Sequence, residues 1–171
     1  LEEIHEFIDL YYNMEVRDKP ENQELYIVLT LAAYQAVNIM EWKALRASDI
    51  DLQQGVIHIP SRRRSNARTL NLQPSQIGVL YPFLQGKQAD DYLIALPLSS
   101  SYFWAMDLRK LYPKFQDFKQ LRASMITYWI QTEGLRKAQY KAGHRYVSST
   151  EKFLANDLES LKEDINSFHP L

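Results

Sequence analysis

The chain has 171 residues, of which 46% are hydrophobic and 24% are charged, and its formal net charge is −1. This composition predicts a domain with a real core and excludes wholesale disorder. The absence of cysteine excludes a disulfide scaffold, a cysteine-ligated zinc site and a thiol nucleophile. The small net charge excludes a uniformly basic coat for nucleic acid, although it leaves room for a basic patch.

The first part of the chain carries helical spacing. Residues 1–16 alternate acidic and apolar side chains at that spacing, and residues 17–22, which include Pro20, predict a loop. Residues 23–46 continue the helical pattern for longer than one ordinary helix. We therefore expect two helices joined tightly near Val37–Asn38.

The period then changes from helical to alternating. Residues 56–60 and 69–72 are short β-type runs, and residues 61–68 between them predict a hairpin whose tip carries four arginines. Pro74 predicts the start of a helix that ends near Leu84. Further helices are expected over 100–112, 118–133, 135–142, 148–155 and 157–167, with a turn at Gly143.

Together these elements predict a mainly α fold with a small antiparallel β-sheet, in the α+β class. We expect one domain over 1–171 that ends in a C-terminal tail helix over 157–171. No run reaches the ~18 apolar residues of a membrane-spanning helix, so no membrane partner is expected. The N-terminus lacks an initiator methionine and the basic and apolar regions of a signal peptide, which predicts a fragment of a longer protein.

Basic residues are concentrated in three segments. Residues 62–68, 109–122 and 135–145 hold 13 of the 20 lysines and arginines but only one of the 21 acidic residues. If these segments meet in space, they form one cationic face suited to a phosphate backbone. The alternative is three solvated surfaces with no common target.

The sequence contains no phosphate-binding loop, dinucleotide fingerprint, zincin motif or hydrolase elbow. Its four histidines are His5, His58, His144 and His169, and they lack metal-ligand spacing. We therefore expect neither a cofactor nor a metal site.

One constellation of residues has a specific order and spacing. A helix start with basic residues over 118–124 (FKQLRAS) precedes a Gly143-His144 turn and a Ser/Thr-rich helix start. Upstream, residues 36–42 (AVNIMEW) lead to residues 48–51 (SDID) and then to the arginine hairpin. Over residues 23–158 this order resembles the catalytic domain of the tyrosine recombinases, the phage-integrase family.

The resemblance implies a metal-free reaction in which a tyrosine hydroxyl attacks a DNA phosphate. Two arginines and a histidine stabilise the charge that builds on the phosphate, and a hairpin lysine protonates the leaving oxygen. The covalent phosphotyrosine permits rejoining without an energy cofactor. In the family an N-terminal core-binding domain shares the recognition of DNA, and we expect this domain to be absent from the chain or removed.

Four of the six positions implied by the resemblance have changed. Asn38 stands where the first arginine of a Gly-Leu-Arg-x-Ser-Glu-Leu turn is usual, and Arg63 or Arg64 aligns with the hairpin lysine. Lys119 replaces a histidine. Arginine is a poor proton donor because it stays protonated, but these last changes keep the positive charge.

The remaining positions decide what the site can do. Arg122 and His144 keep the residues of the family, whereas the nucleophile, expected nine residues after that histidine, is Phe153. A phenyl ring cannot form a phosphate ester. We therefore predict a domain with no intact catalytic site that still binds double-stranded DNA.

The expected contacts to DNA phosphates come from basic side chains on the hairpin, at the helix start and in the Gly-His turn. They are Arg62, Arg63, Arg64, Arg68, Lys119, Arg122, His144 and Arg145. Such a partner predicts a cytoplasmic, nucleoid-associated protein of a mobile element or a chromosome-maintenance system.

Two alternatives remain open at this point. The chain is an active recombinase if a displaced tyrosine, Tyr146 or Tyr140, acts as the nucleophile. It is a protein-interaction module if its acidic flanks bind an active recombinase without DNA contact. The tail carries Leu158, Leu161 and Ile165 at helical spacing, so it either docks on a second copy or a recombinase partner, or packs on its own core.

Overall fold

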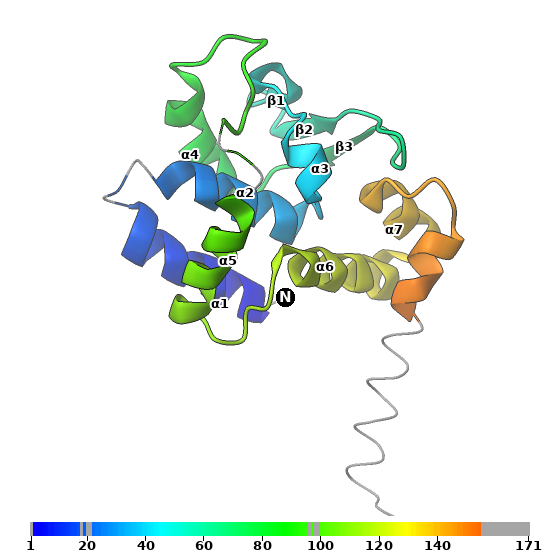
Figure 1. Cartoon of the computed structure of the whole chain (residues 1–171). Coiled ribbons are helices and arrows are strands. Elements are labelled where there is room, and N and C mark those ends of the chain that lie inside the picture. The colour runs from blue at the N-terminus through cyan, green and yellow to red at the C-terminus, as the bar shows by residue number, and fades with distance from the viewer. Residues whose placement is uncertain (1, 18, 20–21, 96, 98–99, 155–171) are drawn as a thin grey trace, which may run out of the picture.

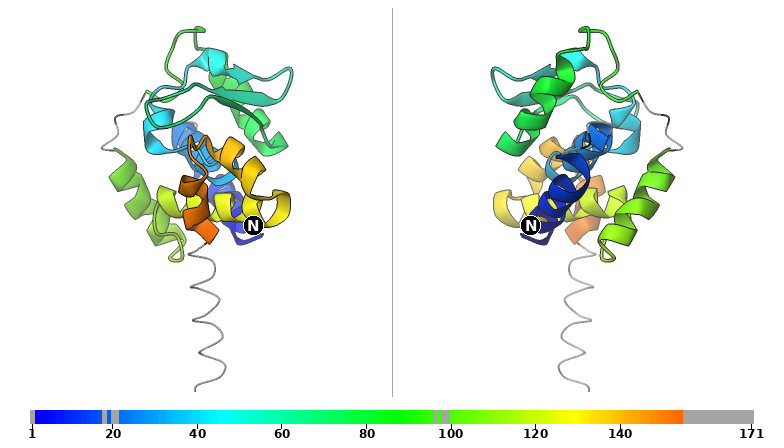
Figure 2. Two further views of the ribbon diagram at one scale, coloured as in Figure 1. Left: turned by 90° about the vertical axis from the view of Figure 1, so that its right-hand side faces the viewer. Right: turned by 90° about the vertical axis from the view of Figure 1, so that its left-hand side faces the viewer.

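The computed structural model describes residues 2–17, 19, 22–95, 97 and 100–154. A small sheet lies at one end of the molecule, α1 (Glu2–Tyr11) and α6 (Phe118–Glu133) lie at the other end, and α7 (Leu135–Ala142) packs between them against the last strand of the sheet (Figures 1 and 2). The sheet is antiparallel with the order β1-β2-β3, and its strands are β1 (Ile50–Asp51), β2 (Val56–Ile59) and β3 (Arg68–Asn71). The predicted mainly α fold with a small antiparallel sheet is confirmed.

The register of the hairpin follows the alternation of its side chains. Ile57 pairs with Leu70 and Ile59 pairs with Arg68, and all four residues are buried. The intervening pair faces solvent, where His58 Nδ1 and Thr69 Oγ1 lie 2.8 Å apart. One face of the hairpin therefore belongs to the core, and Arg68 lies on that face.

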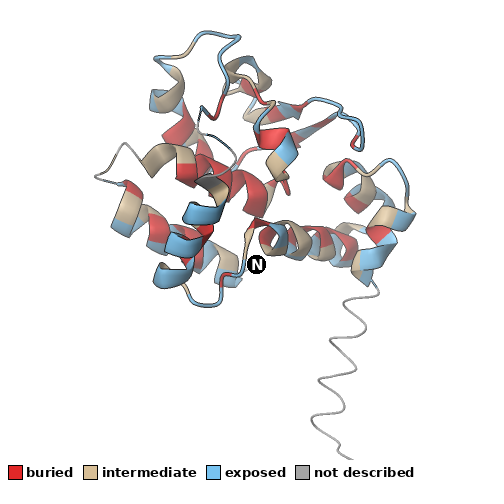
Figure 3. Ribbon diagram, in the orientation of Figure 1, coloured by how far each residue is buried: buried red, intermediate tan, exposed pale blue. Residues whose placement is uncertain are grey.

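The helix α2 (Gln23–Tyr34) forms the centre of the core, and residues 25–33 are all buried (Figure 3). A helix that is apolar on every side is stable only when neighbours cover it all round. Its neighbours here are α1 (Glu2–Tyr11), α4 (Pro74–Leu84) and α6 (Phe118–Glu133).

The long helical pattern over 23–46 breaks where the sequence predicts. After α2 the backbone of Ala36 adopts a positive φ of 49°, and α3 (Ile39–Trp42) starts with Asn38 as its N-cap. The chain then enters the sheet through a 3₁₀ turn, η3 (Ala47–Asp49). Residues 1–16 are also helical where described, but the last five form a wider turn, η1 (Tyr12–Val16).

The C-terminal helices begin and end at residues suited to those positions. Asp117 caps α6 by accepting the backbone N–H of Gln120 at 2.8 Å, and Gly134 ends this helix with a φ of 87°. Gly143 ends α7 with a φ of 70°, in the left-handed region that glycine tolerates best. The remaining helices are α5 (Ser100–Leu111), α7 (Leu135–Ala142) and a helix over 148–154. The predicted tail helix over 157–171 lies outside the described residues.

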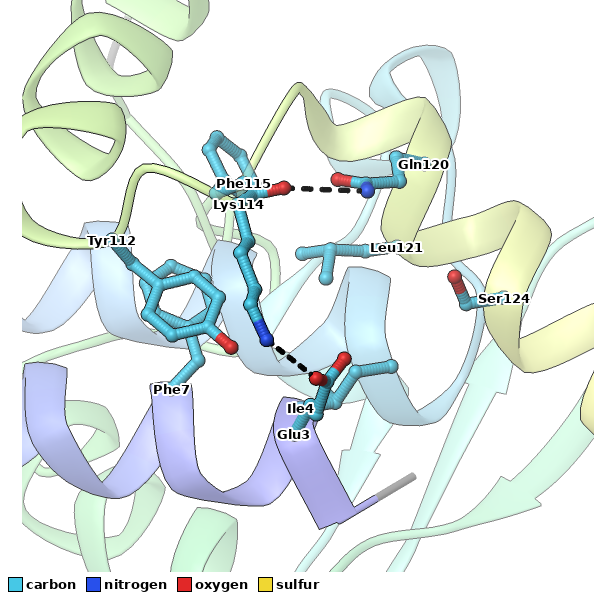
Figure 4. A pocket seen from close by; sticks show the side chains of 9 residues that line it. All are labelled: Glu3, Ile4, Phe7, Tyr112, Lys114, Phe115, Gln120, Leu121 and Ser124. Atoms are coloured by element: carbon cyan, nitrogen blue, oxygen red, sulfur yellow. Dashed lines mark hydrogen bonds and ion pairs between the residues drawn. The ribbon is translucent and has the colours of Figure 1, made fainter. Parts of the chain in front are cut away.

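A small hollow of about 100 Å³ lies between α1 and the connection from α5 to α6 (Figure 4). Lys114 Nζ donates to Glu3 Oε1 at 2.7 Å across it, and Phe7 stacks on Tyr112 with ring centroids 4.8 Å apart. This hollow is too small for a nucleotide and is part of the packing of α1. In the described part of the chain, no helix is long and apolar enough to cross a membrane.

Candidate functional site

A pocket of about 460 Å³ lies between α3, the tip of the β2–β3 hairpin and the Gly143-His144 turn. It brings together segments that are far apart in the sequence. The lining residues are Asn38, Met40, Glu41, Arg62, Arg63, Arg64, Ser65, Arg122 and His144. Six of these were predicted from the sequence as site positions: Asn38, Arg62, Arg63, Arg64, Arg122 and His144.

The rim of the pocket is the hairpin tip, Arg62–Ser65, which forms a tight two-residue turn. Arg62 N–H donates to the Ser65 carbonyl at 2.8 Å, and Ser65 N–H donates back at 3.2 Å. Arg63 and Arg64 lie at the apex of this turn. The side chains of Arg62, Arg63 and Arg64 are all exposed. The hydroxyl of Ser65 is buried and has no hydrogen-bond partner within the described part of the chain.

The floor of the pocket is built on the buried carboxylate of Glu41. Arg68 binds it with both terminal nitrogens, Nη1 to Oε1 at 2.7 Å and Nη2 to Oε2 at 3.0 Å. Burial raises the pKa of Glu41, but the hydrogen bonds and charge of Arg68 more than offset this effect, so the pKa lies below its usual value. The side chains of the pair are 1% and 0% exposed, so the pair belongs to the interior.

Arg122 reaches the same floor from the first turns of α6, and the protein already uses most of its donors. Nη1 donates to the Ala36 carbonyl and lies 3.8 Å from Glu41 Oε2. Nη2 donates to the Ala142 carbonyl at 2.9 Å and lies 3.3 Å from His144 Nε2. Burial lowers the pKa of Arg122 to about 10, so the side chain stays charged at neutral pH. Arg122 therefore joins the ends of α2 and α7.

His144 is neutral and fixed in one tautomer. Because Arg122 can only donate, Nε2 of the ring accepts, and Nδ1 carries the proton that it donates to Thr150 Oγ1 at 2.9 Å. Burial lowers the pKa of His144 to about 4, and the positive charges of Arg122 and Arg68 act in the same direction. At neutral pH this side chain adds no positive charge to the pocket.

Asn38, which the resemblance places at the position of the family's first arginine, is used locally. Its side chain accepts the backbone N–H groups of Met40 at 2.9 Å and Glu41 at 3.1 Å. In return, Glu41 Oε2 accepts the Asn38 N–H at 3.0 Å, which completes a capping box. The Asn38 side chain thus fixes the start of α3 and orients Glu41.

The structure contradicts the predicted phosphate contact of Arg68. This residue lies at the start of β3 rather than at the hairpin tip, and its side chain points inward to Glu41. The alternation along the strand could have indicated this orientation, because Arg68 shares a face with Leu70 and Leu72. All three of these side chains are buried.

Besides Arg68, three predicted site residues lie outside the pocket lining. Lys119 is exposed, three residues before Arg122 on α6. Arg145 is exposed and donates from Nη2 to the Arg62 carbonyl at 3.0 Å. Phe153 lies behind His144, with the two rings stacked at a centroid distance of 5.9 Å and an angle of 13°.

Both candidate displaced tyrosines also lie outside the pocket lining. The Tyr140 hydroxyl accepts the Thr69 N–H at 3.4 Å and lines a separate hollow between β3, α6 and α7. Tyr146 is 71% exposed and follows Arg145 in the turn. No tyrosine is among the described residues that line the arginine pocket.

Sequence reasoning missed Glu41, Ser65 and Met40 as members of the site. Glu41 could have been found, since it stands three residues after Asn38 and so fits the last position of a capping box. Ser65 and Met40 carry no such signal, because only the fold brings the hairpin tip to α3. Within the described ranges, no group of three or more histidine and acidic side chains is placed to hold a metal ion.

The fold is similar to solved structures of recombinases and integrases. XerA recombinase matches with a TM-score of 0.72 and 21% identity, over 99% of this chain and 64% of that chain. XerH site-specific recombinase, bound to palindromic difH substrate in a post-cleavage complex, matches with a TM-score of 0.70 and 18% identity, over 96% and 51%. The Tn1549 transposon integrase, in complex with circular intermediate DNA, matches with a TM-score of 0.64 and 12% identity, over 92% and 64%.

These matches confirm the predicted fold, which is that of the tyrosine-recombinase catalytic domain. The chain spans 51% to 64% of the length of these structures. The sequence matches no protein-family profile and no curated protein.

Proposed function

We propose that this domain binds double-stranded DNA through backbone phosphates at the arginine rim of the pocket and does not cleave the strand. The pocket is concave, and Arg62, Arg63 and Arg64 line it while remaining exposed. Exposed guanidinium groups bind phosphate through paired N–H donors.

The observation that carries the absence of cleavage is the side chain of Phe153. It occupies the position of the nucleophile implied by the family order, next to His144, and offers a ring without a hydroxyl. The hydroxyl of Tyr140 serves a different hollow, and Tyr146 is exposed to solvent and does not line the pocket. Because no tyrosine hydroxyl among the described residues is available in the pocket to attack a phosphate, a phosphotyrosine intermediate cannot form in this arrangement.

The floor supports the same proposal. Transition-state stabilisation needs donors that are pre-organised toward the oxygens on which charge builds and that are not already used within the protein. The Asn38 side chain caps α3, and the terminal nitrogens of Arg122 are bonded to backbone carbonyls and to His144. The rim therefore has cations available for binding, whereas the floor has few donors left for catalysis.

Two assays test the two halves of this proposal. Fluorescence anisotropy with a labelled duplex across a salt series measures binding, and we expect the logarithm of the affinity to fall linearly with the logarithm of salt concentration. Incubation with a nicked suicide duplex, followed by a denaturing gel, measures cleavage, and we expect no covalent adduct. An adduct would show that another tyrosine is active, and no binding at low salt would leave the protein-interaction alternative.

We infer in addition that the C-terminal tail provides a protein contact, with a second copy or with an active recombinase. The helical spacing of Leu158, Leu161 and Ile165 supports this inference, and the segment lies outside the described residues. Sedimentation of the full chain and of a chain truncated after residue 154, with and without duplex, tests it. A DNA ligand would place the protein in the cytoplasm with the nucleoid, which imaging of a tagged full-length protein would test.

A further inference from the structure

The hairpin tip is held against the turn that follows α7. Asn66 N–H donates to the Gly143 carbonyl at 2.8 Å, and Ser65 and His144 form an antiparallel bridge. Arg145 closes the contact by donating from Nη2 to the Arg62 carbonyl at 3.0 Å. These contacts attach the hairpin tip, which is the rim of the pocket, to the turn that contains Gly143 and His144.

This attachment opposes two effects that would otherwise move the tip. Arg62, Arg63 and Arg64 are consecutive, and their like charges repel one another. A two-stranded hairpin on its own is also only marginally stable in water. Contacts that hold the tip in one position remove part of the ordering cost that a phosphate ligand would otherwise have to meet.

The position of Arg145 distinguishes it from the rim arginines. It is exposed and basic, as they are, but it does not line the pocket, and its Nη2 is directed to the hairpin backbone. Removing this side chain would leave the Arg62 carbonyl with the Ser65 N–H alone and would keep the three rim guanidinium groups in the chain. The salt dependence of DNA binding can therefore distinguish a direct phosphate contact of Arg145 from a clamping contact.

We propose that Arg145 is a positioning residue, which clamps the hairpin tip so that the rim arginines are pre-organised for phosphate, and that it does not itself bind phosphate. The inference rests on the proposed DNA binding, and it adds the role of a residue that sequence alone assigns to DNA contact. It also predicts that the clamp is present in the free protein.

The number of phosphate contacts can be measured from the dependence of DNA affinity on salt. Each lost contact lowers the magnitude of the slope by about 0.9. Three variants are compared by anisotropy with the same labelled duplex: Arg145→Ala, Arg63→Ala as the direct contact, and Arg109→Ala as the matched control. Arg109 is also an exposed arginine that donates to one backbone carbonyl, that of Gln116 at 2.7 Å, but it lies on α5, away from the hairpin (Figure 1).

We expect Arg145→Ala to weaken binding about fivefold, the scale of one net hydrogen bond, with the slope of the wild type. Arg63→Ala should lower the slope by about 0.9, and Arg109→Ala should change neither quantity. A slope loss for Arg145→Ala equal to that of Arg63→Ala would overturn the proposal, since it would identify a direct contact. Unchanged affinity would overturn it as well.

Hydrogen exchange in the free protein gives a readout that does not depend on DNA. The amide protons of Arg62, Ser65 and Asn66 are hydrogen-bonded at the tip, so Arg145→Ala should raise their exchange rates while α2 keeps its protection. Unchanged exchange at the tip would contradict the clamp. If the wild type binds no DNA, the proposed function fails, and this measurement still decides whether the clamp exists.

Discussion

Two groups of arginines lie at the pocket, and they differ in burial and in whether a carboxylate faces them. Arg122 in the floor and Arg68 beneath it have side chains that are 15% and 0% exposed, and both face the carboxylate of Glu41. In the rim, Arg62, Arg63 and Arg64 are exposed and face solvent. Burial and the presence of a counter-charge, rather than residue type, therefore separate arginines that hold the fold from arginines available to a ligand.

This difference separates two kinds of arginine, those expected to stabilise the fold and those proposed to bind phosphate. The floor residues bind backbone carbonyls and Glu41, so substituting them should lower the free energy of unfolding. The rim residues contribute little to packing, so substituting them should lower only the affinity for DNA. Each prediction below tests one side of this division.

The largest effect is expected for Glu41→Gln. This change leaves the buried guanidinium of Arg68 without its counter-charge, and removing one partner of a buried ion pair costs about 3–5 kcal/mol. Urea unfolding measures the loss. The control is Glu133→Gln, whose ion pair with Lys141 is about 30% exposed and should cost less than about 1 kcal/mol. Equal losses for the two variants would remove the distinction between floor and surface.

Gly143→Ala should be the next most damaging change. The φ of 70° disfavours an L side chain, and a Cβ would lie 3.0 Å from Arg68 Cζ and 3.1 Å from the Asn66 carbonyl. Strain and crowding together predict a loss of about 2–4 kcal/mol, measured by thermal or urea unfolding. Gly78→Ala is the control, since this helical glycine of α4 has open space around it, and it should stabilise by about 0.5–1 kcal/mol.

The stability of the domain should depend on pH through His144. Its pKa is about 4 in the folded chain, against 6.5 for an unperturbed histidine, so the unfolded chain binds more protons between these values. The contribution of His144 to the free energy of unfolding is therefore fully present above pH 6.5 and is lost as the pH is lowered toward 4. Allowing for partial exposure of the ring, we expect a loss of about 1–2 kcal/mol between about pH 7 and about pH 5.

Urea midpoints of the wild type and of His144→Gln at these two pH values isolate this contribution. The variant should lose less stability than the wild type on acidification, because it has no proton to take up at this position. Glu41, whose pKa lies below its usual value, stays ionised over the same range and does not add to the difference. Parallel losses in the two proteins would show that the Arg122–His144 contact does not hold the neutral ring.

The smallest effect is expected for Phe153→Tyr, which introduces a hydroxyl at the position that we propose for the nucleophile. We expect no adduct with a nicked suicide duplex, because Asn38 caps α3 and the terminal donors of Arg122 are bonded within the floor. Binding and stability should also stay close to those of the wild type. An adduct on a denaturing gel would show that the floor still supports catalysis and would break the division between the two regions.

The order of secondary structure could be predicted from the sequence, since it depends on local patterns. The hairpin, the junction near Asn38, the start at Pro74 and the end at Gly143 all follow from turn and cap chemistry. The apolar positions of α2 likewise predicted the core. These features need no knowledge of which elements meet in space.

The roles of the arginines were harder to predict, since they depend on which partners the fold supplies. Four arginines in one hairpin segment looked equivalent, yet Arg68 faces the core because the strand alternates, whereas Arg62 stays at the tip. Arg122 lines the pocket, but its hydrogen bonds to Ala36 and Ala142 come from segments that only the tertiary structure brings together. Counter-charges and backbone acceptors are the part that spacing does not encode.

The most direct test of the division between rim and floor compares the salt dependence of DNA binding for one variant of each. Arg64→Ala and Arg122→Gln are titrated with the same labelled duplex, at a temperature where both are folded. We predict that the slope falls by about 0.9 for Arg64→Ala and stays at the wild-type value for Arg122→Gln. A slope that falls only for Arg122→Gln would contradict this division, since the buried floor and not the exposed rim would then hold the phosphate.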